Sequence, residues 1–319
     1  MNLKIKSIDE SQKKASNILF VCMSFESIRW KKYLETNNNY QKYDKTVIFY
    51  NKEFINLYKE DISVYEKNDK YEVIETSISD PLLTIDKYIE IVLKYDNKLI
   101  DIDCSTFTHE HLFIFLKVCA HLKHNSKINI IYTSVEDYLL DEDNGWLSKG
   151  TKEIRNIIGY SGNLLPSKQL HLIVLVGLEN ERIQKIIEEY EPNKITIGKA
   201  TIKSSLNGTV SDLNEKLHNR VDKFVKKVVS NLNDTQQFEF SSNNPEETFE
   251  VLNTIINENS NYNNIIVAAN SKISTLGVAK LGLLNENIQI CYAEPIEYNT
   301  EHYTKGCKDF KYFEFIFND

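Results

Sequence analysis

Cysteine, proline and glycine are scarce in this sequence, and long hydrophobic runs are absent. Among 319 residues there are 5 cysteines, 5 prolines and 10 glycines. The cysteines are odd in number and no two are spaced as Cys-x-x-Cys, which argues for reduced thiols and against a disulfide framework or a zinc site. No apolar run approaches the roughly 18 residues of a membrane-spanning helix, so we expect no membrane association.

An excess of basic residues is also missing. The chain has 38 lysines and arginines against 46 aspartates and glutamates, a net charge of −8. Extended duplex nucleic acid needs a broad basic surface and is therefore not an expected partner, whereas a local basic pocket for one nucleotide or a short oligonucleotide stays open. The sequence MNLKIKSIDESQKK lacks the apolar core of a signal peptide, which predicts a cytoplasmic protein. The abundance of Asn, Lys, Ile and Tyr suggests a bacterial genome rich in AT.

The common catalytic and cofactor motifs are not found. The sequence contains no GxGxxG after a strand, no GxxxxGK[ST], no HExxH and no GxSxG. The first two motifs hold phosphates, the third holds zinc and the fourth presents a nucleophilic serine. We therefore predict neither a cofactor nor a bound metal, and the sequence assigns no catalytic residue.

The chain does contain the same unit twice. Residues 18–35 and 171–188 align without gaps, and the identical pairs are Leu19/Leu172, Val21/Val174, Glu26/Glu179, Arg29/Arg182, Lys32/Lys185 and Glu35/Glu188. Residues 128–138 then match 288–298, and residues 147–150 match 303–306. Because the blocks keep their order, we predict two similar domains related by internal duplication, residues 1–165 and 166–319.

Strand and helix patterns alternate in both halves. Short apolar runs predict buried strands at residues 18–23, 46–50, 99–103, 128–132, 171–176, 194–198, 265–269 and 288–292. Helical patterns lie between them, including residues 81–97, 107–123 and 272–284, whereas 233–247 is typical of a loop. The alternation predicts an α/β fold of two tandem Rossmann-like units, each a three-layer, mostly parallel sheet.

Charged residues follow the first strand of each unit, where ligands bind in open parallel sheets. Glu26 and Arg29 correspond to Glu179 and Arg182. An arginine near a helix start can hold phosphate, helped by free main-chain amides. The alternative is a structural ion pair between residues three apart on one helix.

The second loop differs between the units. In the second half, Asn270-Ser271-Lys272 precedes a helix, and amides, hydroxyls and a lysine at that place predict an anion site or a simple helix cap. In the first half, Asp103 ends a strand and is followed by Ser105 and Thr106, which could bind a metal, a ribose or a cap amide. For Asp101, two residues earlier on the strand, we favour a structural role. The corresponding positions of the second half are Val267 and Ala269.

The third loop begins with an aromatic residue in each half. Tyr132 and Tyr292 end matching strands, where a tyrosine can stack on a base or pack at the rim of the sheet. The matched Lys149-Gly150 and Lys305-Gly306 follow as basic turns.

The tandem of Rossmann-like units with polar loops after the strands resembles the CARF and SAVED sensor families of prokaryotic antiviral defence. Several CARF (CRISPR-associated Rossmann fold) proteins have a turn with threonine and lysine, between a strand and a helix, that contacts the phosphates of the ligand. Asn270-Ser271-Lys272 stands at the equivalent place here. The resemblance covers residues 17–317 and implies a nucleotide sensor. No nuclease, protease or membrane effector segment is evident, which departs from most members.

These observations predict a sensor or component of a bacterial anti-phage system that binds a nucleotide or small oligonucleotide in a cleft between its pseudo-symmetric halves. Arg29, Arg182 and Lys272 would hold phosphates, and their joint replacement by alanine would abolish binding with little loss of thermal stability. Two alternatives stay open. One is a nucleotide- or nucleic-acid-processing enzyme that uses Asp103 or Glu26 in acid–base or Mg²⁺ chemistry. The other is an adaptor subunit that docks on a larger ATPase or nuclease. A protein partner and a homo-oligomer are compatible with each reading.

Overall fold

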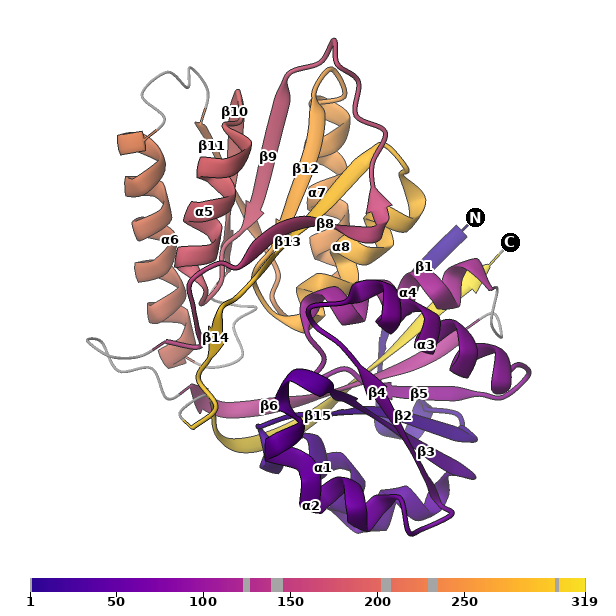
Figure 1. The fold of residues 1–319 in the computed structure, drawn as a ribbon. Coiled ribbons are helices and arrows are strands. Elements are labelled where there is room, and N and C mark those ends of the chain that lie inside the picture. Colours follow the sequence, from indigo (N-terminus) through magenta and orange to yellow (C-terminus); the bar gives the residue numbers. More distant parts are fainter. Residues whose placement is uncertain are drawn as a thin grey trace. The chain divides into compact units, whose positions relative to one another are not determined.

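The computed structural model describes residues 2–122, 127–138, 146–201, 208–228, 235–301 and 304–318 (Figure 1). The chain divides into two compact units. Unit 1 contains Met1–Glu136 and Thr304–Asp319, and unit 2 contains Asp137–Tyr303. Each unit is a mostly parallel sheet with helices on both faces, which confirms the expected pair of Rossmann-like units.

The sheet of unit 1 is built around five parallel strands. Its order is β1 (Asn2–Ile8), β15 (Thr304–Asn318), β6 (Lys127–Tyr138), β5 (Ile100–Asp103), β2 (Ile18–Met23), β3 (Lys45–Asn51) and β4 (Tyr71–Thr76). The strands from β6 to β4 are parallel to their neighbours, and β1 is antiparallel to β15. Buried parallel strands are continuous apolar runs, as β2 is.

Helices cover both faces of this sheet. Figure 1 shows α1 (Ser27–Glu35) and α2 (Ile55–Tyr65) on one face, and α3 (Pro81–Lys94) and α4 (His109–His121) on the other. Short 3-10 turns are η1 (Glu10–Gln12), η2 (Thr36–Lys42) and η3 (Lys52–Phe54). The α1 face packs Trp30 and Tyr33 on the aliphatic side chains of β2. The α3 face is aromatic, with edge-to-face contacts among Phe49, Tyr88 and Phe115.

Unit 2 repeats the plan with an aliphatic core. The sheet order is β11 (Thr235–Phe240), β10 (Lys194–Ala200), β9 (Leu170–Leu175), β12 (Asn263–Ala268), β13 (Ile288–Glu294) and β8 (Glu153–Ser161). One face carries α5 (Asn180–Tyr190) and α6 (Gly208–Val228), and the other carries α7 (Pro245–Glu258) and α8 (Lys272–Leu284) (Figure 1). A small separate sheet pairs β7 (Ser148–Lys149) with β14 (Glu297–Tyr298).

The last strand of each repeat lies in the sheet of the other repeat. β8 follows the turn of the first repeat but pairs antiparallel with β13, a strand of the second repeat. β15 follows the matching turn of the second repeat and lies beside β6 of the first. The expected division into residues 1–165 and 166–319 therefore does not describe the compact units. The repeats are consecutive in sequence, but each unit is completed by a strand from the other repeat.

Candidate functional site

The polar loops lie where the strand order reverses. In unit 1 this point lies between β2 and β5, and in unit 2 between β9 and β12. One hydrogen bond ties the two loops together in each unit. The Thr106 hydroxyl donates to the Cys22 carbonyl at 2.6 Å, and the Asn270 amide donates to the Val176 carbonyl at 2.7 Å. Ligands of doubly wound sheets bind at this crevice. The two loops therefore lie at the carboxyl ends of the parallel strands, as the sequence pattern predicted.

The Glu26–Arg29 pair of unit 1 is buried and held by main chain. Arg29 Nη1 lies 3.4 Å from Glu26 Oε2, with both side chains less than a tenth exposed. Arg29 Nε donates to the Thr133 carbonyl at 3.2 Å, and its guanidinium carbon lies 5.2 Å from the Tyr132 ring centre. The Thr304 hydroxyl donates to Glu26 Oε1 at 2.7 Å. Each group of the pair is thus satisfied inside unit 1.

Unit 2 contains the same arrangement. Arg182 forms an ion pair with Glu179, and Arg182 Nη1 donates to the Ala293 carbonyl at 2.6 Å. The guanidinium carbon lies 5.6 Å from the Tyr292 ring centre. The Ser148 hydroxyl donates to Glu179 Oε1 at 2.9 Å.

The two hydroxyls that bond these glutamates are equivalent in the repeat. Ser148 and Thr304 occupy the same place in the matched turns at residues 147–150 and 303–306. Each turn leads into an exchanged strand, so each Glu–Arg pair holds the segment at which that strand is entered: Thr304 is the first residue of β15, and Ser148 precedes β8 by five residues. The geometry therefore favours the structural alternative for Glu26, Arg29, Glu179 and Arg182, and places Tyr132 and Tyr292 against guanidinium groups.

The matched glycines of these turns have a left-handed backbone. Gly150 has φ +64° and Gly306 has φ +61°. A Cβ would lie 2.8 Å from Ile296 at Gly150 and 2.4 Å from Glu136 at Gly306. Ile296 and Glu136 are themselves equivalent positions of the repeat, so the turn is duplicated, and the left-handed backbone favours glycine at both positions.

Asp103 ends β5 and is buried. Its Oδ1 accepts hydrogen bonds from the Ser105 amide at 3.0 Å and from the Ser105 hydroxyl, which also accepts the Thr133 amide at 2.7 Å. Its Oδ2 has no hydrogen-bond partner among the described residues. Burial raises the pKa of Asp103 to about 6, and the hydrogen bonds from Ser105 and the charge of Arg29 oppose that rise. This carboxyl can exchange a proton near neutral pH.

The strand register identifies the counterpart of Asp103. Asp103 pairs with Val21, and Val267 pairs with Val174. Because Val21 and Val174 are equivalent, Val267 is the residue of unit 2 that corresponds to Asp103. The sequence alignment had matched Ala269 to Asp103, which is two residues out of register. Unit 2 therefore has an apolar residue where unit 1 buries a carboxylate.

Asp101 has the structural role that we favoured. It is fully buried, and its carboxylate contacts the Lys13 ammonium and accepts hydrogen bonds from the hydroxyls of Ser16 and Tyr43. The Asn129 amide donates to it at 2.8 Å. A buried carboxylate needs this degree of pairing, and the network ties the segment before β2 to the sheet.

The Asn270-Ser271-Lys272 turn begins α8. Ser271 is the N-cap, and its hydroxyl oxygen accepts the Ser274 amide at 3.1 Å and donates to the Ser242 carbonyl at 2.7 Å. Asn270 Oδ1 accepts the Ser271 amide at 2.8 Å. All three residues of the turn are half-buried, and Lys272 is the first residue of the helix. The Asn270 and Ser271 side chains shape the turn, and Lys272 supplies its cation.

A further repeated motif lies at the same edge and was missed in the sequence. Residues 77–84 and 241–248 share the pattern Ser-x-x-[Asp/Asn]-Pro-x-x-Thr. The Thr84 hydroxyl donates to the Ser77 carbonyl at 2.8 Å, and the Thr248 hydroxyl donates to the Ser241 carbonyl at 2.6 Å. The motif follows β4 and β11 and begins α3 and α7. Aligning Pro81 of the first half with Pro245 of the second half would have revealed this motif.

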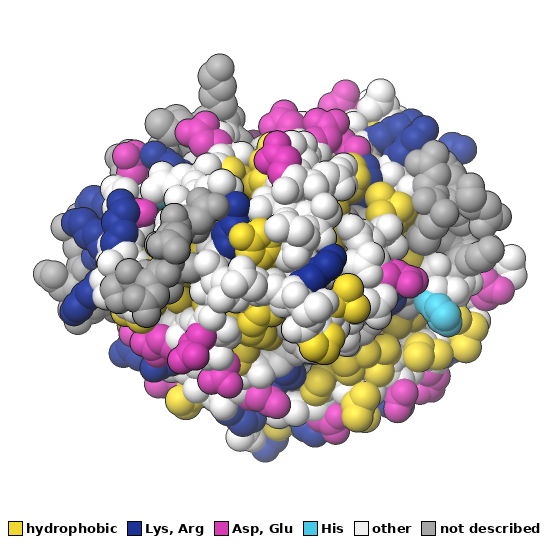
Figure 2. All heavy atoms as spheres, turned by 90° about the horizontal axis from the view of Figure 1, so that it is seen from above, with side chains coloured by type: hydrophobic (Ala, Val, Ile, Leu, Met, Phe, Trp, Pro, Cys, Tyr) yellow, Lys and Arg dark blue, Asp and Glu magenta, His cyan; other side chains and the backbone are white. Residues whose placement is uncertain are grey.

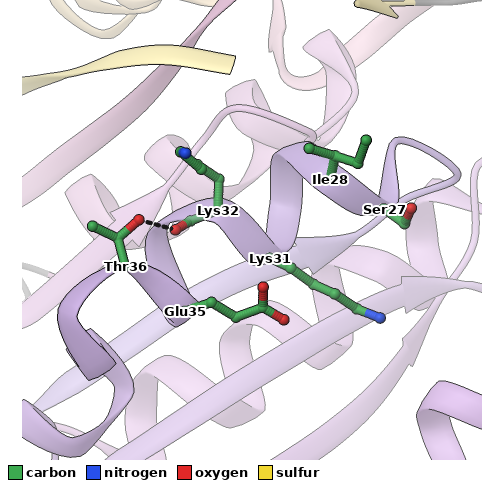
Figure 3. A pocket seen from close by; sticks show the side chains of 6 residues that line it. All are labelled: Ser27, Ile28, Lys31, Lys32, Glu35 and Thr36. Atoms are coloured by element: carbon green, nitrogen blue, oxygen red, sulfur yellow. Dashed lines mark hydrogen bonds between the residues drawn. The ribbon is translucent and has the colours of Figure 1, made fainter. Parts of the chain in front are cut away.

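A hollow of about 450 Å³ lies over the exposed side of α1 and was also not predicted. It is lined by Ser27, Ile28, Lys31, Lys32, Glu35 and Thr36 (Figure 3). On the face that Figure 2 shows, the side chains of Lys and Arg are intermingled with those of Asp and Glu.

Metal and thiol chemistry have little support in the described part of the chain. No group of three His, Cys, Asp or Glu residues there could hold a metal ion. The cysteines are free thiols. Burial raises the pKa of the Cys119 thiol, and it raises the pKa of the Cys291 thiol to about 12. Within the same ranges, no helix is long and apolar enough to cross a membrane.

Comparisons with known proteins do not assign the chain to a family. No family model matches the chain, and no curated protein matches it. Among solved structures, the UDP-GlcNAc 2-epimerase from Methanocaldococcus jannaschii is similar, with a TM-score of 0.24 and 11% identity over 89% of this chain and 96% of that chain. A similarity of this strength carries no argument about ligand or activity.

Proposed function

We propose that the protein binds a nucleotide or another small phosphate-bearing ligand at the Asn270-Ser271-Lys272 turn of unit 2. The observation that carries the proposal is the position of Lys272. It is the first residue of α8, at the crevice between β9 and β12 where ligands of doubly wound sheets bind. The positive end of the helix dipole and the lysine charge act on the same place, which favours an anion.

The difference between the units supports placing the phosphate in unit 2. The equivalent crevice of unit 1 contains the buried carboxyl of Asp103, whose negative charge would repel a phosphate when ionised. Val267 stands there in unit 2, so this position adds no negative charge to the crevice. Arg29 and Arg182 have little part in the proposal, because both are held by glutamate and by main-chain carbonyls.

The wider role expected from the resemblance to CARF and SAVED proteins guides the choice of ligands. A sensor of antiviral defence would bind a small oligonucleotide, whereas a general phosphate site would bind mononucleotides equally well. Both classes belong in one titration series at constant ionic strength, since phosphate binding weakens with salt.

Isothermal titration calorimetry of Lys272→Ala tests the proposal. We expect binding to fall at least tenfold, because the only side-chain cation of the turn is removed, and Lys272→Arg to retain most of it. The matched control is Lys226→Ala, since Lys226 is 65% exposed on α6 and pairs with Asp222. Equal affinity of Lys272→Ala, Lys226→Ala and the unchanged protein would refute the assignment.

A second candidate function is favoured by Asp103. A buried carboxyl with a pKa of about 6 and one oxygen without a hydrogen-bond partner suits general acid–base catalysis on a nucleotide. Incubation with nucleotides, with and without Mg²⁺, followed by chromatography measures turnover. This candidate predicts product that Asp103→Asn abolishes. Turnover unchanged in that variant would exclude Asp103 as the acid or base.

A further inference from the structure

The hollow over α1 differs in charge from the matching surface of unit 2. Its lining contains two lysines and one glutamate, at Lys31, Lys32 and Glu35. The equivalent positions on α5 contain one lysine and three glutamates, at Lys185, Glu181, Glu188 and Glu189. The two helices are copies of one repeated unit. Their net charge differs on the outer surface, while their buried faces keep the same role.

Lys32 is the distinctive residue of the hollow. Its counterpart Lys185 lies 61% exposed and pairs with Glu188, three residues on, at 2.6 Å. Lys32 has Glu35 at the same spacing, yet the two form no ion pair, and Lys32 pairs with no other carboxylate in the part of the chain that the structure describes. Lys32 is also half-buried where Lys185 is exposed. A partly buried ammonium without a counter-ion is unfavourable by itself.

The directions of the side chains explain the missing pair. Figure 3 shows Lys32 and Glu35 leaving α1 in different directions. Lys31 does form an ion pair, with Asp61 of α2 at 2.7 Å, so Lys32 is the lysine of the hollow that has no ion pair among the described residues. Lys32 follows the buried Arg29 by three residues, so it lies on the flank of α1 between the buried face and the exposed residue Ile28.

We propose that the hollow over α1 binds a small phosphate-bearing molecule through the Lys32 ammonium. Its volume of about 450 Å³ lies within the range of small-molecule sites. Ser27, at the first position of α1, adds a hydroxyl at the positive end of the helix, and Ile28, which is 69% exposed, adds an apolar surface for the rest of the ligand. This site is separate from the Asn270-Ser271-Lys272 turn, and the proposal does not depend on that turn.

Pyridoxal 5′-phosphate is a direct probe, because it carries both a phosphate and an aldehyde that reacts with lysine. The Lys Nζ condenses with the aldehyde to an imine with loss of water, and borohydride reduces the imine to a stable secondary amine. Peptide mass spectrometry then gives the rate at each lysine. We expect Lys32 to react at least tenfold faster than Lys185, and inorganic pyrophosphate to suppress that excess. Equal rates at the two lysines, or no protection by pyrophosphate, would overturn the proposal.

Two variants separate this site from the one proposed in unit 2. Equilibrium dialysis of labelled pyrophosphate should show one bound molecule fewer in Lys32→Met than in the control Lys185→Met, both of which keep the aliphatic part of the side chain. Lys272→Ala should leave the labelling of Lys32 and its protection unchanged. Loss of that protection in Lys272→Ala would contradict a separate site over α1. Protected Lys32 with no effect of Lys272→Ala on nucleotide binding would refute only the site in unit 2.

Discussion

Removing Arg182 should destabilise the protein strongly, although the residue was first expected to serve a ligand. Arg182→Met leaves Glu179, which is 9% exposed, without its counter-ion, and removes the hydrogen bond from Arg182 to the Ala293 carbonyl. Breaking a buried pair by removing one partner costs about 3–5 kcal/mol of unfolding free energy. Because the hydroxyl of Ser148 still donates to Glu179 at 2.9 Å, we expect the lower end of that range.

Urea unfolding followed by far-ultraviolet circular dichroism measures this cost. The double variant Glu179→Gln with Arg182→Met should recover part of it, since no buried charge is then left unpaired. Ser148→Ala should cost about 1.5 kcal/mol, the lower value for a hydrogen bond to a charged group. Lys185→Ala, on the exposed side of the same helix, is the control. A loss below about 1 kcal/mol for Arg182→Met would refute a structural role for the pair.

Two further predictions concern stability and pH. Asp103→Asn should stabilise the protein at pH 7.5 by up to about 3 kcal/mol, because the folded pKa of about 6 exceeds the ordinary 3.8 and the folded state disfavours the ionised carboxyl. The stability difference between the variant and the unchanged protein should shrink to near zero at pH 3.5, below the pKa of Asp103 in the unfolded chain. The unchanged protein should therefore lose stability relative to the variant as the pH rises from about 4 to 6. A stability difference that does not depend on pH in urea unfolding would contradict this prediction. Gly306→Ala and Gly150→Ala should each lower the free energy of unfolding by about 1–3 kcal/mol, because both glycines have a left-handed backbone. Lys305→Ala is the control and should not lower it. Equal midpoints for the three variants in thermal unfolding would show that backbone conformation is unimportant at these positions.

The central strands and several helices could be predicted because burial leaves a clear pattern. β2 and α8 begin and end where the apolar run and the Ser271 cap predicted. The edge strands were harder: β4 and β11 read YEVIET and TQQFEF, which lack the continuous apolar run of a buried parallel strand. β11 fell inside a stretch assigned to a loop, and α2 and β1 were not predicted at all.

The exchange of the last strands could not be predicted from the repeat. Sequence similarity shows that residues 147–150 and 303–306 are related, but not which sheet the following strand joins. Spacing likewise predicts that Glu26 and Arg29 share a helix face, and only packing shows that the face is buried. The expectation that replacing Arg29 and Arg182 leaves thermal stability nearly unchanged is therefore replaced by the opposite prediction.

One disulfide trap tests the exchange of strands most directly. Asn156 of β8 lies directly opposite the native Cys291 of β13 in the antiparallel ladder. Directly opposite residues are about 4.5–5.5 Å apart between Cα atoms, within the range of a disulfide. Asn156→Cys should therefore form a disulfide with Cys291 under mild oxidation, detected by mass spectrometry of unreduced peptides, whereas Arg155→Cys, which lies opposite Tyr292, should not. A free thiol at position 156, with Cys291 also unlinked, would contradict the placement of β8 in the sheet of unit 2.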